Sequence, residues 1–317
     1  MVERHFCKVD VRGSNPRAGS MTWIIYSLLG PFFWACSNFV DKYLLGKYTK
    51  GIYDFLFFSS ITGWLFFLII LPFVGLPPLN TYFFIPVLTG MMLIYSYGFY
   101  GKALEKGDTS TLVILFLLIP VVTLVLGYFF LNQSVTVPQL WAFLIVIAGA
   151  LIISFEKTGN FSTKGLGMIS IAIIMWSVMT LLIDYGLAGM SFWQYFMLDN
   201  LGTAIGGVML FAVAPIRREV IIGIRSANIS KYVWFTFNNF LDFSGQMLIK
   251  LALTVSVSAG LVMAIAQVQS FYAILIGLIL TLLIPSIIKE DISKQTLLKK
   301  FFGALVMFIG VSILFLG

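Results

Sequence analysis

Four polar residues lie in the middle of a largely apolar stretch, residues 232–253, that is long enough to cross a bilayer as a helix. Asn239, Asp242 and Gln246 are spaced i, i+3 and i+7, and Asn238 comes four residues before Asp242. This spacing predicts that the four side chains share one broad face of a helix. A carboxylate near the bilayer centre costs at least about 2.5–3.5 kcal/mol, so Asp242 should face protein or a water-filled cavity. Such a face could bind a polar solute reversibly and exchange a proton at the carboxylate.

The alternative for this face is a purely structural hydrogen-bonded contact between helices. Lys250, near the end of the same stretch, either extends to the membrane surface or turns inward, where it could bind an anionic group. Charged residues at the ends of other stretches, such as Asp41, are interpreted as interfacial charges or local pairs, with a gate role as the alternative. Further candidates for the site are Gln267, Tyr97, Asn38 and Asp199. For Asp199 a structural partner and a site role are equally open.

The composition is that of an integral membrane protein. Of 317 residues, 60% are hydrophobic and 10% charged, against about 25% charged in soluble domains, and the mean hydropathy is +1.00. A single histidine (His5) and two separate cysteines (Cys7 and Cys36) argue against a zinc site, a disulfide framework and a histidine-dependent triad. We therefore expect no metal and no cofactor. The net charge of +7 is assigned to loops at the membrane surface rather than to nucleic-acid binding.

Ten stretches are long and apolar enough to predict an all-α protein with ten transmembrane helices. They are Trp23–Leu45, Phe55–Phe73, Tyr82–Leu104, Thr111–Leu131, Leu140–Phe155, Gly167–Leu187, Phe192–Ala214, Tyr232–Leu253, Ser258–Ile288 and Phe301–Leu316. The longest connection, residues 215–231, is basic and is expected at the membrane surface.

The two halves of the chain resemble each other. Trp34 aligns with Trp176 at the head of a collinear series of matches that continues across five stretches. We therefore predict two five-helix repeats, residues 23–155 and 166–316. Because five is odd, the second repeat must start on the opposite side of the membrane. The repeats are then inverted, and a binding site is expected near the midplane between them.

Charge asymmetry predicts the orientation. The lysines and arginines lie in connections on one side of the membrane, apart from Lys250 and those in the polar tail, residues 1–22. The positive-inside rule then puts both termini outside the cytoplasm of a multi-pass protein in the cell membrane. The tail has no apolar core of the kind a signal peptide needs, and it need not be native.

Several segments resemble a known family. Residues 34–40, WACSNFV, resemble the tryptophan and Ser-Asn signature that opens an EamA repeat of the drug/metabolite transporter superfamily. Residues 103–131 are similar to that family's third-to-fourth helix hairpin, with its Pro-Val kink at Pro120, and residues 141–149 to its glycine-containing fifth helix. The resemblance implies transport of small metabolites through a central cavity lined mainly by helices 1, 3, 4, 6, 8 and 9. The second repeat departs from the pattern, since Gln269 lies near the equivalent of Pro120.

The sequence thus predicts a secondary active transporter, not an enzyme, that moves a small organic metabolite (an amino acid, sugar, nucleoside or amine) by alternating access. Proton coupling and exchange are both open, and neither substrate nor direction is readable from the residues. The rival classes are a non-transporting membrane scaffold or receptor and an intramembrane enzyme. We expect a small-molecule substrate and the lipid bilayer as partners, no nucleic acid, and a monomer, because the repeats are fused.

Overall fold

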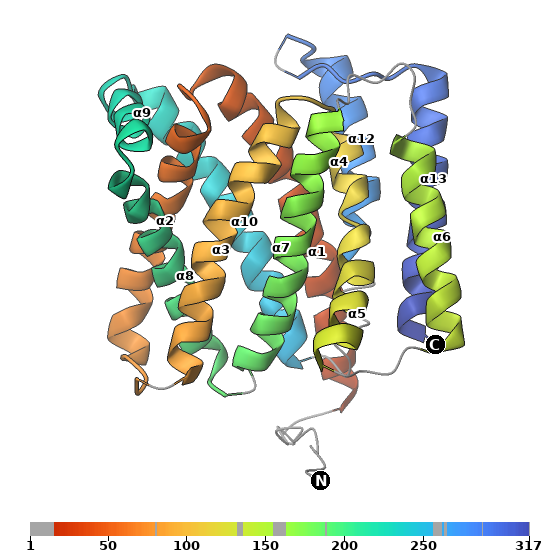
Figure 1. Ribbon diagram of the computed structural model, residues 1–317, viewed down its shortest axis with the longest axis horizontal. Helices are drawn as coiled ribbons and strands as arrows, with labels where there is room; N and C mark the ends of the chain where they lie inside the picture. Colours follow the sequence, from red (N-terminus) through yellow and green to blue (C-terminus); the bar gives the residue numbers. More distant parts are fainter. Residues whose placement is uncertain are drawn as a thin grey trace.

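Figure 1 shows the computed structural model, in which upright helices lie side by side. The structure describes residues 16–79, 81–131, 136–154, 163–187, 189–255, 262, 265–286 and 288–316, and over these residues it contains helices and no strand. The first half forms α1 (Pro16–Lys47), α2 (Ile52–Val74), α3 (Thr81–Leu104), α4 (Thr109–Leu115), α5 (Leu118–Leu131) and α6 (Val137–Ser154). The second half forms α7 (Thr163–Leu187), α8 (Phe192–Met209), the short η1 (Leu210–Ala212), α9 (Ala214–Arg225), α10 (Ile229–Val255), α12 (Gln269–Leu283) and α13 (Lys294–Leu316).

Seven helical segments in the described part of the chain are long and apolar enough to cross a membrane, which confirms the all-α membrane class. They lie in α1, α2, α3, α4 with α5, α7, α8 and α13. Shorter apolar helices, Leu140–Gly149 and Gln269–Leu283, lie in α6 and α12. Helix α10 has 27 residues, but its polar side chains keep it out of this set. Large side chains on the outer faces, such as Phe73 (86% exposed) and Phe129 (70%), suit contact with lipid.

The start of the chain and the basic connection differ from the prediction. Helix α1 begins at Pro16, so residues 16–22 are helical rather than tail, and residues 1–15 lie outside the described part. The connection after α8 contains α9, which was not predicted as a helix. Val220 and Gly223 face the bundle and the arginines of α9 are exposed, so α9 is amphipathic and lies at one end of the bundle (Figure 1).

The predicted fourth span is broken in two, because α4 ends at Leu115 and α5 begins at Leu118. The backbone N–H of Phe116 donates to Val113, three residues back rather than four, at 3.2 Å. Pro120 explains the break: it has no N–H to donate to the carbonyl of Phe116, and its ring collides with that carbonyl in a regular helix. At the start of α5 the same proline is tolerated, since first-turn N–H groups have no helical partner.

The predicted ninth span, Ser258–Ile288, is only partly within the described residues. Helix α12 begins at Gln269 after another tight turn, in which the Val268 N–H donates to the Ile265 carbonyl at 3.0 Å. It ends at Leu283, short of the predicted Ile288, because the residue before Pro285 is driven out of the helical region.

The helices pack in pairs through small residues. Helix α1 runs along α10, α3 contacts α7 and α8, and α2 contacts α8. Helix α5 contacts α7, α12 contacts α1 and α4, and α6 contacts α13. A side chain at Gly30 or at Gly245 would meet the backbone oxygen of the other glycine, at 3.1 and 3.0 Å respectively. Such small residues let helices approach closely enough for many van der Waals contacts within a membrane. This close packing of α1 on α10 holds the polar face of α10 inside the bundle.

Candidate functional site

The polar face of α10 points toward α3. The Tyr97 hydroxyl donates to Asp242 Oδ1 at 2.7 Å, and the Gln246 amide donates to Asp242 Oδ2, also at 2.7 Å. Both carboxylate oxygens of Asp242 therefore accept hydrogen bonds from neutral donors. The structure brings these three predicted residues into one contact, and that contact joins the two halves of the chain.

Lys250 turns inward and forms an ion pair with Asp199 of α8. Lys250 Nζ lies 2.7 Å from Asp199 Oδ2, and the two side chains are only 7% and 4% exposed. The Thr89 hydroxyl donates to Asp199 Oδ1 at 2.7 Å, while Lys250 also donates to Gln246 Oε1 at 3.4 Å. The positive charge that could have bound an anionic group is thus compensated by Asp199, and Gln246 links this pair to Asp242.

Asp41 of α1, which the sequence left as an interfacial charge, a local pair or a gate residue, is buried inside the bundle and lines the same cavity as Asp242. It is 5% exposed, and the Asn238 amide donates to Asp41 Oδ1 at 2.6 Å. Ser37 in turn donates to Asn238 Oδ1 at 3.0 Å. The sequence does hold a signal for this arrangement, since Asp41 follows Ser37 by four residues and helical spacing puts both on one face.

The remaining predicted residues occupy different places. The Asn239 amide donates to the Phe58 carbonyl of α2 at 3.1 Å. Asn38 Oδ1 accepts from the Tyr100 hydroxyl at 3.0 Å. Gln267 is buried next to the tight turn before α12. Neither Asn38 nor Gln267 lines the cavity that the other candidates share.

One small cavity lies among α1, α2, α3, α8 and α10. Of the seven predicted site residues, five line it: Asp242, Asn239, Gln246, Tyr97 and Asp199. Its volume is about 30 Å³, which is room for water molecules and not for an organic solute. Ser59 of α2 also lines it, and the buried Ser59 hydroxyl has no hydrogen-bond partner. The cavity is therefore polar, too small for an organic solute, and has one hydroxyl with unused hydrogen-bonding capacity.

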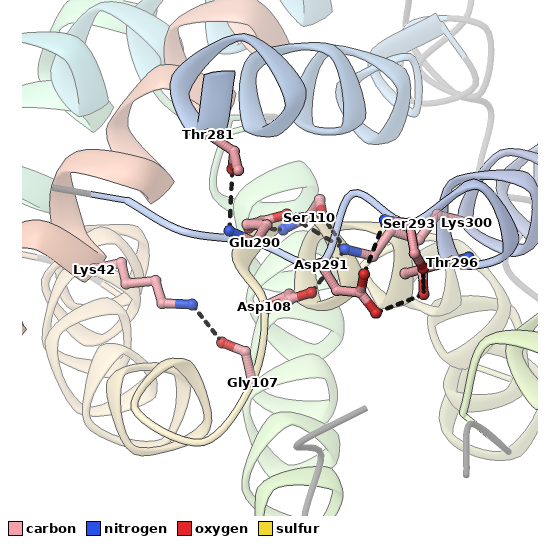
Figure 2. A network of polar contacts seen from close by, with 10 residues as sticks. All are labelled: Lys42, Gly107, Asp108, Ser110, Thr281, Glu290, Asp291, Ser293, Thr296 and Lys300. Atoms are coloured by element: carbon pink, nitrogen blue, oxygen red, sulfur yellow. Dashed lines mark hydrogen bonds and ion pairs between the residues drawn. The ribbon is translucent and has the colours of Figure 1, made fainter. Parts of the chain in front are cut away.

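A second polar cluster, which we call the end cluster, consists of Asp108, Ser110, Glu290 and Lys300 and joins the start of α4 to the segment between α12 and α13 (Figure 2). Glu290 accepts a hydrogen bond from the Ser110 backbone N–H at 3.1 Å and another from its hydroxyl. Lys300 Nζ lies 2.8 Å from Asp108 Oδ2 and 3.4 Å from Glu290 Oε2. These contacts fix the start of α4 to the segment between α12 and α13. Because the charged side chains pair with one another, we interpret the end cluster as structural.

Asp291 lies beside the end cluster in the loop before α13. The Ser293 backbone N–H donates to Asp291 Oδ1 at 2.9 Å, and the Thr296 hydroxyl donates to Asp291 Oδ2 at 2.7 Å. These hydrogen bonds, the backbone one first, lower the pKa of Asp291 because they stabilise its charged form.

A further ion pair, at the same end, joins α2 to α10. Lys231 Nζ lies 2.7 Å from both carboxylate oxygens of Asp54, and it also sits 4.0 Å from the centre of the Phe58 ring. Glu219 of α9 accepts from the backbone N–H groups of Tyr53 and Asp54 at 2.8 and 3.3 Å. Helix α9 is thereby held against the first turn of α2, where a carboxylate is favoured by the helix dipole.

Together, the apolar helices and the polar cavity between them define a helical membrane protein with a polar site inside its bundle. Comparison with known families makes this more specific: residues 21–155 match the EamA-like transporter family. The first half of the chain is thus an EamA-like unit, and the resemblance to EamA-type transporters of the drug/metabolite transporter superfamily is confirmed. The match ends at residue 155, where the first predicted repeat also ends.

Comparison with individual proteins gives information on the fold but not on the function. No curated protein matches the chain. A solved structure titled "Crystal structure of protein" aligns over 94% of this chain and 96% of its own, with 13% sequence identity and a TM-score of 0.50. The overall fold is therefore shared with a solved protein along nearly the full length of both chains.

Proposed function

We propose that this chain is a secondary active transporter that moves a small organic metabolite across the membrane by alternating access. The observation that carries the proposal is the polar cavity enclosed between helices of both halves, with Asp242 and Tyr97 in contact across it. A buried carboxylate, an ion pair and free hydrogen-bonding groups are costly within a bilayer and mark solute pathways in membrane proteins. We assign the site to Asp242, Asn239, Gln246, Tyr97 and Asp199, and add Asp41 from α1.

The packing of the helices supports two inverted five-helix repeats, residues 23–155 and 166–316. If a two-fold axis exchanges the repeats, α1 corresponds to α7 and α3 to α10. The contact of α1 with α10 then corresponds to that of α3 with α7, and both contacts are present. The contact of α5 with α7 corresponds in the same way to that of α12 with α1. The breaks before α5 and before α12 also fall at corresponding places.

One pair of contacts departs from this symmetry. Helix α3 packs closely along α8, whereas the corresponding helices α10 and α2 make few contacts. In a transporter of inverted repeats, such a difference is what separates the two conformations, because each repeat takes the shape of the other when access switches. We infer that the alternative state loosens α3 from α8 and closes α10 onto α2.

Solute flux into proteoliposomes tests the proposal. The purified chain is reconstituted and loaded in turn with an amino acid, sugar, nucleoside or amine mixture, and exchange of labelled solute is followed. We expect flux of at least one class, reduced in Asp242→Asn and unchanged in Glu105→Gln, since Glu105 is exposed at the end of α3 and far from the cavity lining. A scaffold or an enzyme would give no flux of any class.

A further inference from the structure

The cavity carries more negative than positive charge. Three carboxylates line it, those of Asp41, Asp199 and Asp242, and no lysine or arginine is among the described residues that line it. Lys250 contacts two residues of the lining, Gln246 at 3.4 Å and Asp199, with which it forms an ion pair at 2.7 Å. Within the described residues, neither Asp41 nor Asp242 forms an ion pair of its own, and Lys250 reaches Asp242 only through Gln246.

Neutral groups donate the hydrogen bonds that the structure shows to these two carboxylates. Asp242 accepts from Tyr97 and Gln246, and Asp41 accepts from the Asn238 amide. Hydrogen bonds from neutral donors do not offset the cost of burying a charge as an opposite charge does, so such carboxylates favour a bound cation or proton. The same charges disfavour an anionic solute.

The other groups around the cavity suit an organic cation. Phe196 and Phe243 line it beside Tyr97, and aromatic rings attract cations while covering an apolar body. The unpartnered hydroxyl of Ser59, a residue that is 9% exposed, is free to hydrogen-bond an N–H group. Within the described residues no three His, Cys, Asp or Glu side chains gather closely enough to hold a metal ion.

We propose that this site selects a protonated organic amine with an apolar body, held by Asp41 and Asp242. The inference rests on the transport function proposed above, which left the class of solute open. An opened form of the cavity must admit the amine, because the closed volume of about 30 Å³ holds only water.

A trio of compounds with one body and three charges tests the charge of the solute. The probes are 2-phenylethylamine, 2-phenylethanol and phenylacetate, which differ only at the polar end. Binding is measured at neutral pH by calorimetry on the full chain in nanodiscs, with empty nanodiscs as the blank. We expect the amine to bind and the alcohol and the acid to bind at least about tenfold more weakly, as is usual when a charge-assisted contact is lost.

Variants then test the two carboxylates. Asp242→Asn and Asp41→Asn should each weaken binding of the amine at least about tenfold. Glu105→Gln removes one negative charge far from the cavity and should leave binding unchanged. Each variant is first checked for a monodisperse elution profile. If a variant does not fold, the comparison of the three probes on the unaltered chain still decides the question.

The outcomes separate the two proposals. Phenylacetate or 2-phenylethanol binding as tightly as the amine would overturn the inference, as would absence of amine binding or an amine affinity that both folded variants retain. Flux of acids or neutral solutes but not of amines would overturn it too, while leaving transport intact. Absence of flux for every class would remove the transport proposal as well.

Discussion

The ion pair between Lys250 and Asp199 offers a strong test of how the central site is held together. We consider Lys250→Met, which keeps a long apolar stem but removes the charge. In the structure the pair has a separation of 2.7 Å and side chains that are 7% and 4% exposed. Thr89 keeps Asp199 Oδ1 occupied, so the variant leaves Asp199 with one oxygen unpaired in the interior.

The expected loss of stability follows from that burial. Removing one partner of a buried ion pair leaves an uncompensated charge and costs about 3–5 kcal/mol of unfolding free energy. Asp199→Asn should cost a similar amount, because it strands the ammonium group of Lys250. The double variant should lose much less than the two single losses added together, since its remaining defect is a buried amide that lacks a partner, at about 1–3 kcal/mol.

Reversible unfolding in mixed micelles with increasing SDS, followed by circular dichroism, measures these free energies. Lys50→Met is the matched control, because Lys50 is exposed and its loss should change stability by no more than about 0.5 kcal/mol. Equal losses in Lys250→Met and Lys50→Met would refute the reasoning. So would strict additivity of the two single variants in the double variant, since neighbouring partners must couple.

Three further predictions use the same measurement, the last of them as a function of pH. Gly202→Ala should destabilise the protein by about 1–3 kcal/mol, because the new methyl group would meet the backbone of Val87. Gly167→Ala is the matched control: its methyl group would meet no atom within van der Waals distance, so it should stabilise the protein by about 0.5–1 kcal/mol. Equal effects of the two variants would contradict the packing of α8 on α3. Lys300→Met should cost about 3–5 kcal/mol by stranding Glu290, whose side chain is 3% exposed, and a loss no greater than that of Lys50→Met would remove its structural role. In the loop before α13, the lowered pKa of Asp291 means that its ionised carboxylate stabilises the folded protein above about pH 4 and that this stabilisation is lost as the pH falls further. The unfolding free energy of Asp291→Asn should therefore fall less between about pH 5 and acid pH than that of the unaltered chain.

Much of the fold is predictable from the sequence because a bilayer imposes simple rules. Apolar length alone indicated the membrane class and the approximate bounds of most helices. The break after Leu115 was not predicted as such, although Pro120 supplies its cause and was already identified as a kink. Helix α9 was missed because it is short and basic, and only its docking against α2 through Glu219 shows why it is ordered.

The central site, too, was predictable from the sequence only in part. The spacing of Asn239, Asp242 and Gln246 by itself indicated one polar face on α10, since helical periodicity is a local property. Which partners meet that face depends on how distant helices pack, and only the tertiary structure placed Tyr97 on Asp242 and Asp199 on Lys250. It also showed that Asp41 lines the same cavity as Asp242. The sequence determined that a costly carboxylate lies within the membrane; the packing decided which carboxylates are compensated and which are not, because charge compensation depends on distances that only the fold sets.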